Sequence, residues 1–119
     1  MLKTLILIVT SLTCWVAPVV AQTTDVSMTA DARCVIVGAR LAASTDPSQK
    51  DRATMLIVYY IGKLDGRASG LNLERLIVDQ AVHMTSADYP TELLRCSEAL
   101  AVKGQEITRI GNELTKLGK

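Results

Sequence analysis

The sequence lacks the motifs on which most enzyme and metal chemistry depends. It contains one histidine, His83, and this residue has no neighbouring cysteine that would complete a metal site. No glycine-rich phosphate loop is present, and the segment Gly66-Arg67-Ala68-Ser69-Gly70 places its serine at the wrong position for a nucleophile elbow. We therefore expect a non-enzymatic protein with no metal and no cofactor, in which His83 has a structural role.

The chain also lacks an excess of charge. Without Lys3, which belongs to the leader described next, it carries 12 basic (13 minus 1) and 12 acidic side chains. A neutral balance gives no long-range attraction to nucleic acid or to an anionic membrane surface. Neither is expected as a partner.

The first 21 residues have the pattern of a secretory signal peptide. Lys3 provides a basic start, an apolar run begins at Leu5, and Val19-Val20-Ala21 is a small-residue cleavage site. The alternative is an uncleaved membrane anchor, but the apolar core is short for a span and Pro18 interrupts its end. We expect cleavage between Ala21 and Gln22, export to the periplasm, and no stable membrane insertion afterwards.

Two cysteines remain after cleavage, because Cys14 leaves with the leader. An even number of cysteines in an oxidising compartment predicts a Cys34–Cys96 disulfide, and two buried free thiols are the alternative. The disulfide would close a loop of 63 residues, counting both cysteines (96 minus 34, plus 1). The chain-entropy model gives about 4 kcal/mol of stabilisation for a loop of that length.

The 98 residues after the leader (119 minus 21) fit one small all-α domain of four helices over 29–119, preceded by a flexible segment, 22–28. The first helix is expected to begin at Thr29 and to end near Ala43, with Cys34 facing the core. The third is expected from Leu73 to Met84, capped by Asn72.

The second helix contains the most apolar run of the chain after the leader, from Met55 to Ile61. This run alone would fit a buried strand equally well. The preceding Asp46-Pro47, a cap followed by a favourable first residue, favours a helix that ends at Gly66. We expect it to be the buried central helix of the domain, with Gly62 as its point of close contact.

The last helix, which begins between Asp88 and Pro90 and ends near Leu117, is the most regular. Its apolar residues repeat every seven positions, beside a parallel row of small residues. The apolar row is Leu93, Leu100, Ile107 and Leu114, and the small row is Ser97, Gly104 and Gly111. Such rows allow another helix to approach closely.

Two groups of apolar side chains are candidates for protein binding. The first belongs to the run on the second helix and the second to the seven-residue row: Met55, Leu56, Ile57, Tyr59, Tyr60, Leu93, Leu100, Ile107 and Leu114. The alternative is that these side chains simply form the core. The partners they would serve are one protein partner, denatured client proteins, or a second copy in a homodimer.

The layout resembles the HdeA-type periplasmic acid-stress chaperones of Gram-negative bacteria. The resemblance rests on Cys34 in the first helix, an apolar central helix, and Cys96 near the start of a charged last helix. It implies a disulfide-linked helical dimer that partly unfolds at low pH and holds denatured proteins. Near pH 2 the 12 carboxylates are neutral and the 12 basic side chains remain charged, so self-repulsion would loosen the fold.

The chain also resembles, more loosely, the small helical periplasmic immunity proteins of type VI secretion, in which a helix end comparable to Tyr60-Ile61-Gly62 occurs. Those proteins usually carry more cysteines than the pair found here. Two hypotheses follow, a conditional chaperone that exposes apolar helix surface and, as the alternative, an immunity or inhibitor protein that recognises one partner through its folded surface.

Overall fold

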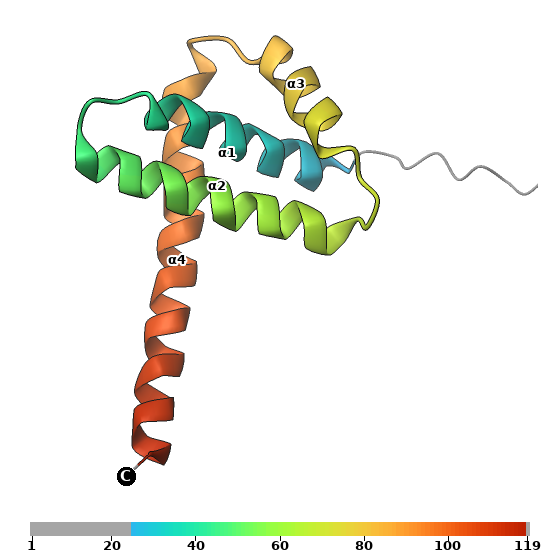
Figure 1. Cartoon of the computed structure of the whole chain (residues 1–119). Helices are drawn as coiled ribbons and strands as arrows, with labels where there is room; N and C mark the ends of the chain where they lie inside the picture. Colours follow the sequence, from blue (N-terminus) through green and yellow to red (C-terminus); the bar gives the residue numbers. More distant parts are fainter. Residues whose placement is uncertain (1–24, 119) are drawn as a thin grey trace, which may run out of the picture.

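The computed structural model describes residues 25–118, and this part of the chain is all-α (Figure 1). Its helices are α1 (Val26–Ala42), α2 (Pro47–Arg67), α3 (Leu73–His83) and α4 (Asp88–Leu117). The predicted fold class is confirmed, and so is the disulfide between Cys34 and Cys96. The predicted leader, its cleavage site and residues 22–24 lie outside the described residues.

The central helix is α1, and the prediction that α2 is central was wrong. Helix α1 contacts α2, α3 and α4, and its inward side chains are buried from Met28 to Val37. Helix α2 runs alongside α1 in the opposite direction (Figure 1) and buries one face only, so Met55 is 59% and Val58 is 67% exposed. An unbroken apolar run on a helix points in all directions, and one neighbouring helix can cover only part of it. The α2 residues that are buried are Ala53, Leu56, Tyr60 and Leu64.

Helix α1 begins one turn earlier than the predicted start at Thr29. The side chain of Asp25 accepts a hydrogen bond from the backbone N–H of Ser27 at 3.1 Å and thereby caps the helix. Met28, placed in the predicted flexible segment 22–28, is helical and only 8% exposed. An aspartate cap just before an apolar residue was the signal that the sequence prediction missed.

Capping fixes the start of α2 as predicted, but its end differs. Asp46 accepts a hydrogen bond from the N–H of Ser48 at 2.9 Å, and Pro47 is the first helical residue. The helix continues through Gly66 to Arg67 and ends at Ala68 in an extended conformation. The glycine with a positive φ is Gly70, at 84°, which turns the chain toward α3.

The close contact between α1 and α2 is made by Gly38, and the prediction that Gly62 makes it was wrong. A Cβ added at Gly38 would lie 2.7 Å from Cγ1 of Ile57 and 3.3 Å from the carbonyl oxygen of Ala53. Gly62 has no heavy atom of a neighbouring element within 4 Å of such a Cβ. Gly38 lies on the face of α1 that α2 covers, whereas Gly62 lies on the solvent side of α2.

Alanine substitutions at these two glycines should therefore have opposite effects. Gly62→Ala should stabilise the protein by about 0.5–1 kcal/mol, because alanine favours the helix over glycine. Gly38→Ala gains the same helix preference but forces α2 outward, and overpacking costs about 1–3 kcal/mol, so a net loss is expected. Urea unfolding of the two variants against the parent chain measures both. Equal stabilisation by both substitutions would show that the helices do not meet at Gly38.

Helix α4 has two halves with different surroundings. Its first half packs on α1 and α2 through Leu93, Cys96 and Leu100. Its second half extends past the other helices (Figure 1), and every residue from Gly104 to Gly118 is exposed. Thirty helical residues span about 45 Å. Within residues 25–118, no helix combines the length and apolar character that a membrane span requires.

Candidate protein-binding surface

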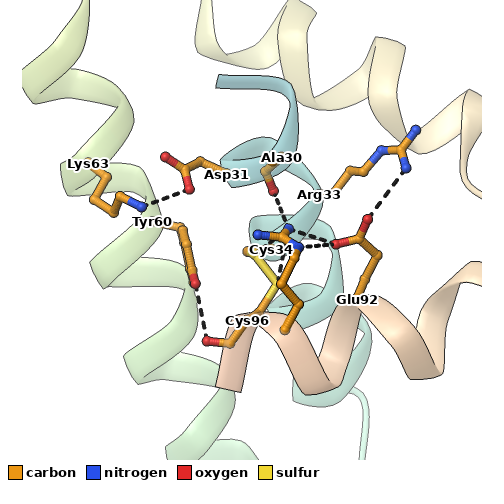
Figure 2. The surroundings of a disulfide bond; sticks show 9 residues. Ala30, Asp31, Arg33, Cys34, Tyr60, Lys63, Glu92 and Cys96 are labelled. Carbon is orange, nitrogen blue, oxygen red and sulfur yellow. Dashed lines mark hydrogen bonds and ion pairs between the residues drawn. A yellow bond between two sulfur atoms is a disulfide. The ribbon is translucent and has the colours of Figure 1, made fainter. Parts of the chain in front are cut away.

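A polar cluster covers the disulfide between α1 and α4 (Figure 2). Cys34 and Cys96 are fully buried. Nη2 of Arg95 donates to the carbonyl oxygen of Ala30 at 2.8 Å and to Oε2 of Glu92 at 2.6 Å, and it lies 3.1 Å from Sγ of Cys34. Glu92 also accepts from Arg33 at 3.4 Å. The carboxylate of Glu92 thus joins two guanidinium groups and reinforces the α1–α4 contact beside the disulfide.

The same cluster is the one place in the described residues where three metal-ligating side chains converge. Ligand atoms of Cys34, Glu92 and Cys96 all lie within 4.8 Å of one another. However, the two sulfurs are bonded to each other, and thiolates rather than disulfide sulfurs bind metals. The guanidinium of Arg95 also contacts both the sulfur and the carboxylate. This geometry favours a structural disulfide over a metal site.

Tyr60 connects α2 to this cluster. Its side chain is fully buried, and its hydroxyl donates a hydrogen bond to the carbonyl oxygen of Cys96 at 3.1 Å (Figure 2). Burial raises the pKa of Tyr60, which keeps the hydroxyl protonated as the donor that this bond requires. Tyr60 was a candidate for binding or for core packing, and its contacts place it in the core.

A buried carboxylate joins α1 to the end of α2. Asp31 is 4% exposed, and its Oδ1 lies 2.9 Å from Nζ of Lys63. Its Oδ2 lies 2.8 Å from Nη1 of Arg67, close enough for charge attraction although the hydrogen-bond alignment is poor. The sequence pattern of α1 does not indicate this role for Asp31, which adjoins residues that pack in the core. The available signal was that Lys63 and Arg67 are four residues apart and so share one face of α2.

The predicted binding residues separate into three groups by exposure. Leu56 and Tyr60 are buried. Four others, Ile57, Tyr59, Leu93 and Leu100, are half-buried. Met55, Ile107 and Leu114 are exposed by 59–63%. Only this last group can contact a partner extensively without a change in the fold.

The exposed apolar residues at the end of α4 lie on one side of that helix. We call Ile107, Ile110, Leu114 and Leu117 the α4 strip; their exposed fractions are 63%, 43%, 62% and 81%. Their spacing of three and four residues continues the face on which Leu93, Cys96 and Leu100 pack against the domain. The α4 strip is therefore a core-type helix face that extends beyond the core. Ile107 and Leu114 were predicted from the seven-residue repeat, whereas Ile110 and Leu117 were not.

Polar groups border the α4 strip. Lys103 and Glu106 form an ion pair that raises the pKa of the lysine and lowers that of the glutamate, and Lys116 pairs with Glu113 at 2.8 Å. On the opposite side of α4 a shallow groove passes Gly104, Thr108 and Asn112, with Gln105 and Arg109 also at its border. Apolar residues flanked by charges and glycines are typical of helix-pairing surfaces.

A second depression lies between α3 and the beginning of α1. This open cleft is bordered by Leu71, Val78 and His83 among others. Nδ1 of His83 is 2.7 Å from the carbonyl oxygen of Asp79, and the buried Gln80 accepts from Arg33, so both are already occupied within the protein. Polar side chains of Asn72, Arg75 and Asp79 also border the cleft, whereas small-molecule sites are lined mostly by apolar groups.

No protein-family model matches the chain, and no curated protein or solved structure matches it either. The surfaces of the chain itself are therefore the basis on which its function has to be assigned.

Proposed function

We propose that this is a non-enzymatic exported protein that binds another protein through a surface of its folded state, the α4 strip. The observation that carries the proposal is the exposure of four large apolar side chains on one face of a projecting helix. Single exposed apolar residues are normal, but a contiguous row of them marks an interaction site in most soluble proteins. Export is inferred from the leader pattern between Lys3 and Ala21.

The scaffold supports this proposal because it holds α4 by its first half. The disulfide, the Tyr60 hydrogen bond and the Arg95 cluster all lie near Cys96. The second half is then presented as a preformed helix, and a preformed helix loses little conformational entropy on binding. A partner helix laid along the strip would use the helix-in-groove mode of recognition.

A conditional chaperone is the second candidate, and the attachment of α2 is the observation that favours it. The disulfide joins α1 to α4, so α2 carries no cross-link of its own and is joined to its neighbours only by the loops of the chain. Helix α2 is held by packing and by the ion pairs from Asp31 to Lys63 and Arg67. The other titratable or charged groups that face this contact are Tyr60 of α2 and Glu92 and Arg95 of α4. Strong acid neutralises carboxylates and would leave two unpaired cations there. Released α2 would expose Leu56, Tyr60 and Leu64.

Site-specific photo-crosslinking at two pH values tests both candidates together. A photoreactive phenylalanine analogue is placed at Leu114, at Ile61 on the half-buried side of α2, or at Val102, which is exposed but off the strip. The purified protein is irradiated in a Gram-negative periplasmic extract at pH 7 and near pH 2. Binding through the folded surface predicts one discrete adduct from Leu114 at pH 7 and none from Val102.

The chaperone predicts a different pattern. Ile61 would give many adducts near pH 2 and none at pH 7, together with suppressed aggregation of a client protein in acid. An absence of adducts from Leu114 at pH 7 contradicts the leading proposal. A protein whose near-UV circular dichroism is unchanged near pH 2, and which protects no client, contradicts the second.

A further inference from the structure

We propose that the α4 strip binds a second copy of this chain, in an antiparallel and two-fold symmetric pair of projecting α4 helices. This inference rests on the proposed function and names its partner. It follows from the position of the strip relative to the domain, from the order of charges beside it, and from the area that it can bury.

The position of the strip decides the direction of pairing. Upstream of the strip, the same face of α4 is covered by α1 and α2, against which Leu93, Cys96 and Leu100 pack. A parallel second helix would bring its own domain to this end, where the first domain already occupies the face. An antiparallel helix approaches with its free C-terminal end and carries its domain to the far end. Such a pair is isologous and closes as a dimer.

The spacing of the strip residues fixes the register. Residues along a helix seam follow one another at alternating steps of three and four positions, which gives two kinds of seam position. In antiparallel helix pairs, a residue of one kind faces a residue of the other kind in the second helix. The central layer then places Ile107 of one copy against Ile110 of the other, twice by symmetry. The next layer places Lys103 opposite Leu114, at the point where the strip meets the domain.

The charges beside the strip fit this register. Lys103 is paired with Glu106 in its own chain. In the antiparallel register Lys103 also lies beside Glu113 of the second copy, the residue adjacent to Leu114. The lysine would therefore lie between two glutamates of different chains and offset their repulsion. A parallel pair would instead place the two Lys103 side chains opposite each other, and like charges at such a position disfavour pairing.

Two glycines of α4, Gly104 and Gly111, also fit the antiparallel pair. In the same register Gly104 of one copy lies near Gly111 of the other, because each glycine directly follows a seam position, Lys103 or Ile110. Gly111, like Gly104, has no neighbouring element within 4 Å in the single chain. Small residues at facing positions let two helix backbones approach closely, which brings the apolar seam into full contact.

The apolar area that the two strips can bury limits the stability of the dimer. Eight apolar side chains, four from each copy, would each remove roughly 60–120 Å² of apolar surface from water, or about 500–1,000 Å² together. Specific interfaces below about 1,200 Å² are weak or transient. We therefore expect a reversible dimer whose population depends on concentration and not a permanent one.

Sedimentation analysis of the purified protein without its leader, at concentrations from about 1 µM to about 1 mM, tests the inference over the range in which weak complexes dissociate. A monomer–dimer equilibrium is expected. Ile107→Gln should raise the dissociation constant at least tenfold, whereas Val102→Gln should change it less than twofold. The two positions form a matched pair because they are 63% and 65% exposed on the same helix, so neither substitution disturbs the core.

Carbodiimide coupling tests the register. This reagent joins a lysine to a glutamate only where they are in contact, and Lys103 and Glu113 of one helix are about 15 Å apart. A Lys103–Glu113 amide in the dimer is therefore expected only from the antiparallel pair. The Lys103–Glu106 amide within one chain serves as the positive control, because these two residues already form an ion pair.

Several outcomes would overturn the inference. These are a monomer at every concentration, equal weakening by Ile107→Gln and Val102→Gln, or a dimer without the Lys103–Glu113 amide. The proposed function is tested separately. A monomeric protein that still gives a discrete adduct from Leu114 with a different protein overturns the second copy as partner and leaves binding through the α4 strip intact.

Discussion

The Cys34→Ala/Cys96→Ala variant is expected to lose about 4 kcal/mol of unfolding free energy. The bond closes a loop with a sequence separation of 62 and thereby restricts the unfolded chain. Small domains have about 5–15 kcal/mol in total, so the loss is a large share of the stability. Helix α4 is affected most, because its exposed second half contributes no packing that could replace the bond.

Urea unfolding followed by far-UV circular dichroism measures this loss. The reduced parent protein is the matched control, since breaking the bond without changing the side chains should give nearly the same midpoint as the double variant. A loss below about 1 kcal/mol for both would show that the unfolded chain is already restricted by residual structure. Agreement between the two would assign the effect to loop closure and not to the volume of the sulfur atoms.

Tyr60→Ala is expected to lower the unfolding free energy by about 3–5 kcal/mol, as large-to-small substitutions of buried aromatic residues do. Tyr60 is the largest fully buried side chain among the described residues. Its removal leaves a cavity beside α4 and takes away the side-chain hydrogen bond to the carbonyl oxygen of Cys96. The adjacent Tyr59 is the matched control, because it is half-buried and the same substitution there should cost much less.

Tyr60→Phe separates the hydrogen bond from the packing. It should cost about 0.5–1.5 kcal/mol at neutral pH. It should also change the alkaline limb of stability. The pKa of Tyr60 is raised in the folded state by burial, so the folded protein holds this proton more tightly than the unfolded chain. The resulting stability is fully present below pH 10 and is lost as pH rises through the folded pKa. The phenylalanine variant should lack this part of the alkaline decline, and an unchanged decline would show that Tyr60 does not cause it.

Features that depend on local chemistry could be predicted from the sequence. Asp46 with Pro47 marked the start of α2, and Asn72 marked the start of α3, because the atoms that cap a helix lie within three residues of one another. The buried residues Leu56, Tyr60 and Leu64 of α2 are four positions apart, which is the spacing of one face of a helix. The disulfide followed from the number of cysteines and the inferred compartment.

Features that depend on how helices are arranged could not be predicted. The apolar run Met55–Ile61 indicated a buried central helix, yet a less apolar helix, α1, became central because α2, α3 and α4 all pack on it. The ion pairs of Asp31 connect residues 32 and more positions apart, and nothing in a single sequence joins them. The seven-residue row of α4 was recognised, but only the structure shows that its second half extends beyond the domain.

The position of the covalent bond also determines how the molecule would respond to mechanical force. A pull applied between the two ends of the domain passes from α1 through Cys34 and Cys96 into α4. Residues between the cysteines, including all of α2 and α3, lie outside that path and stay unstretched while the bond is intact. Only the start of α1 before Cys34 and the part of α4 after Cys96 can lengthen, by about 2 Å per residue as the 1.5 Å rise of a helix becomes the 3.3–3.6 Å of an extended chain. The segment that yields first under tension is thus the one that carries the α4 strip.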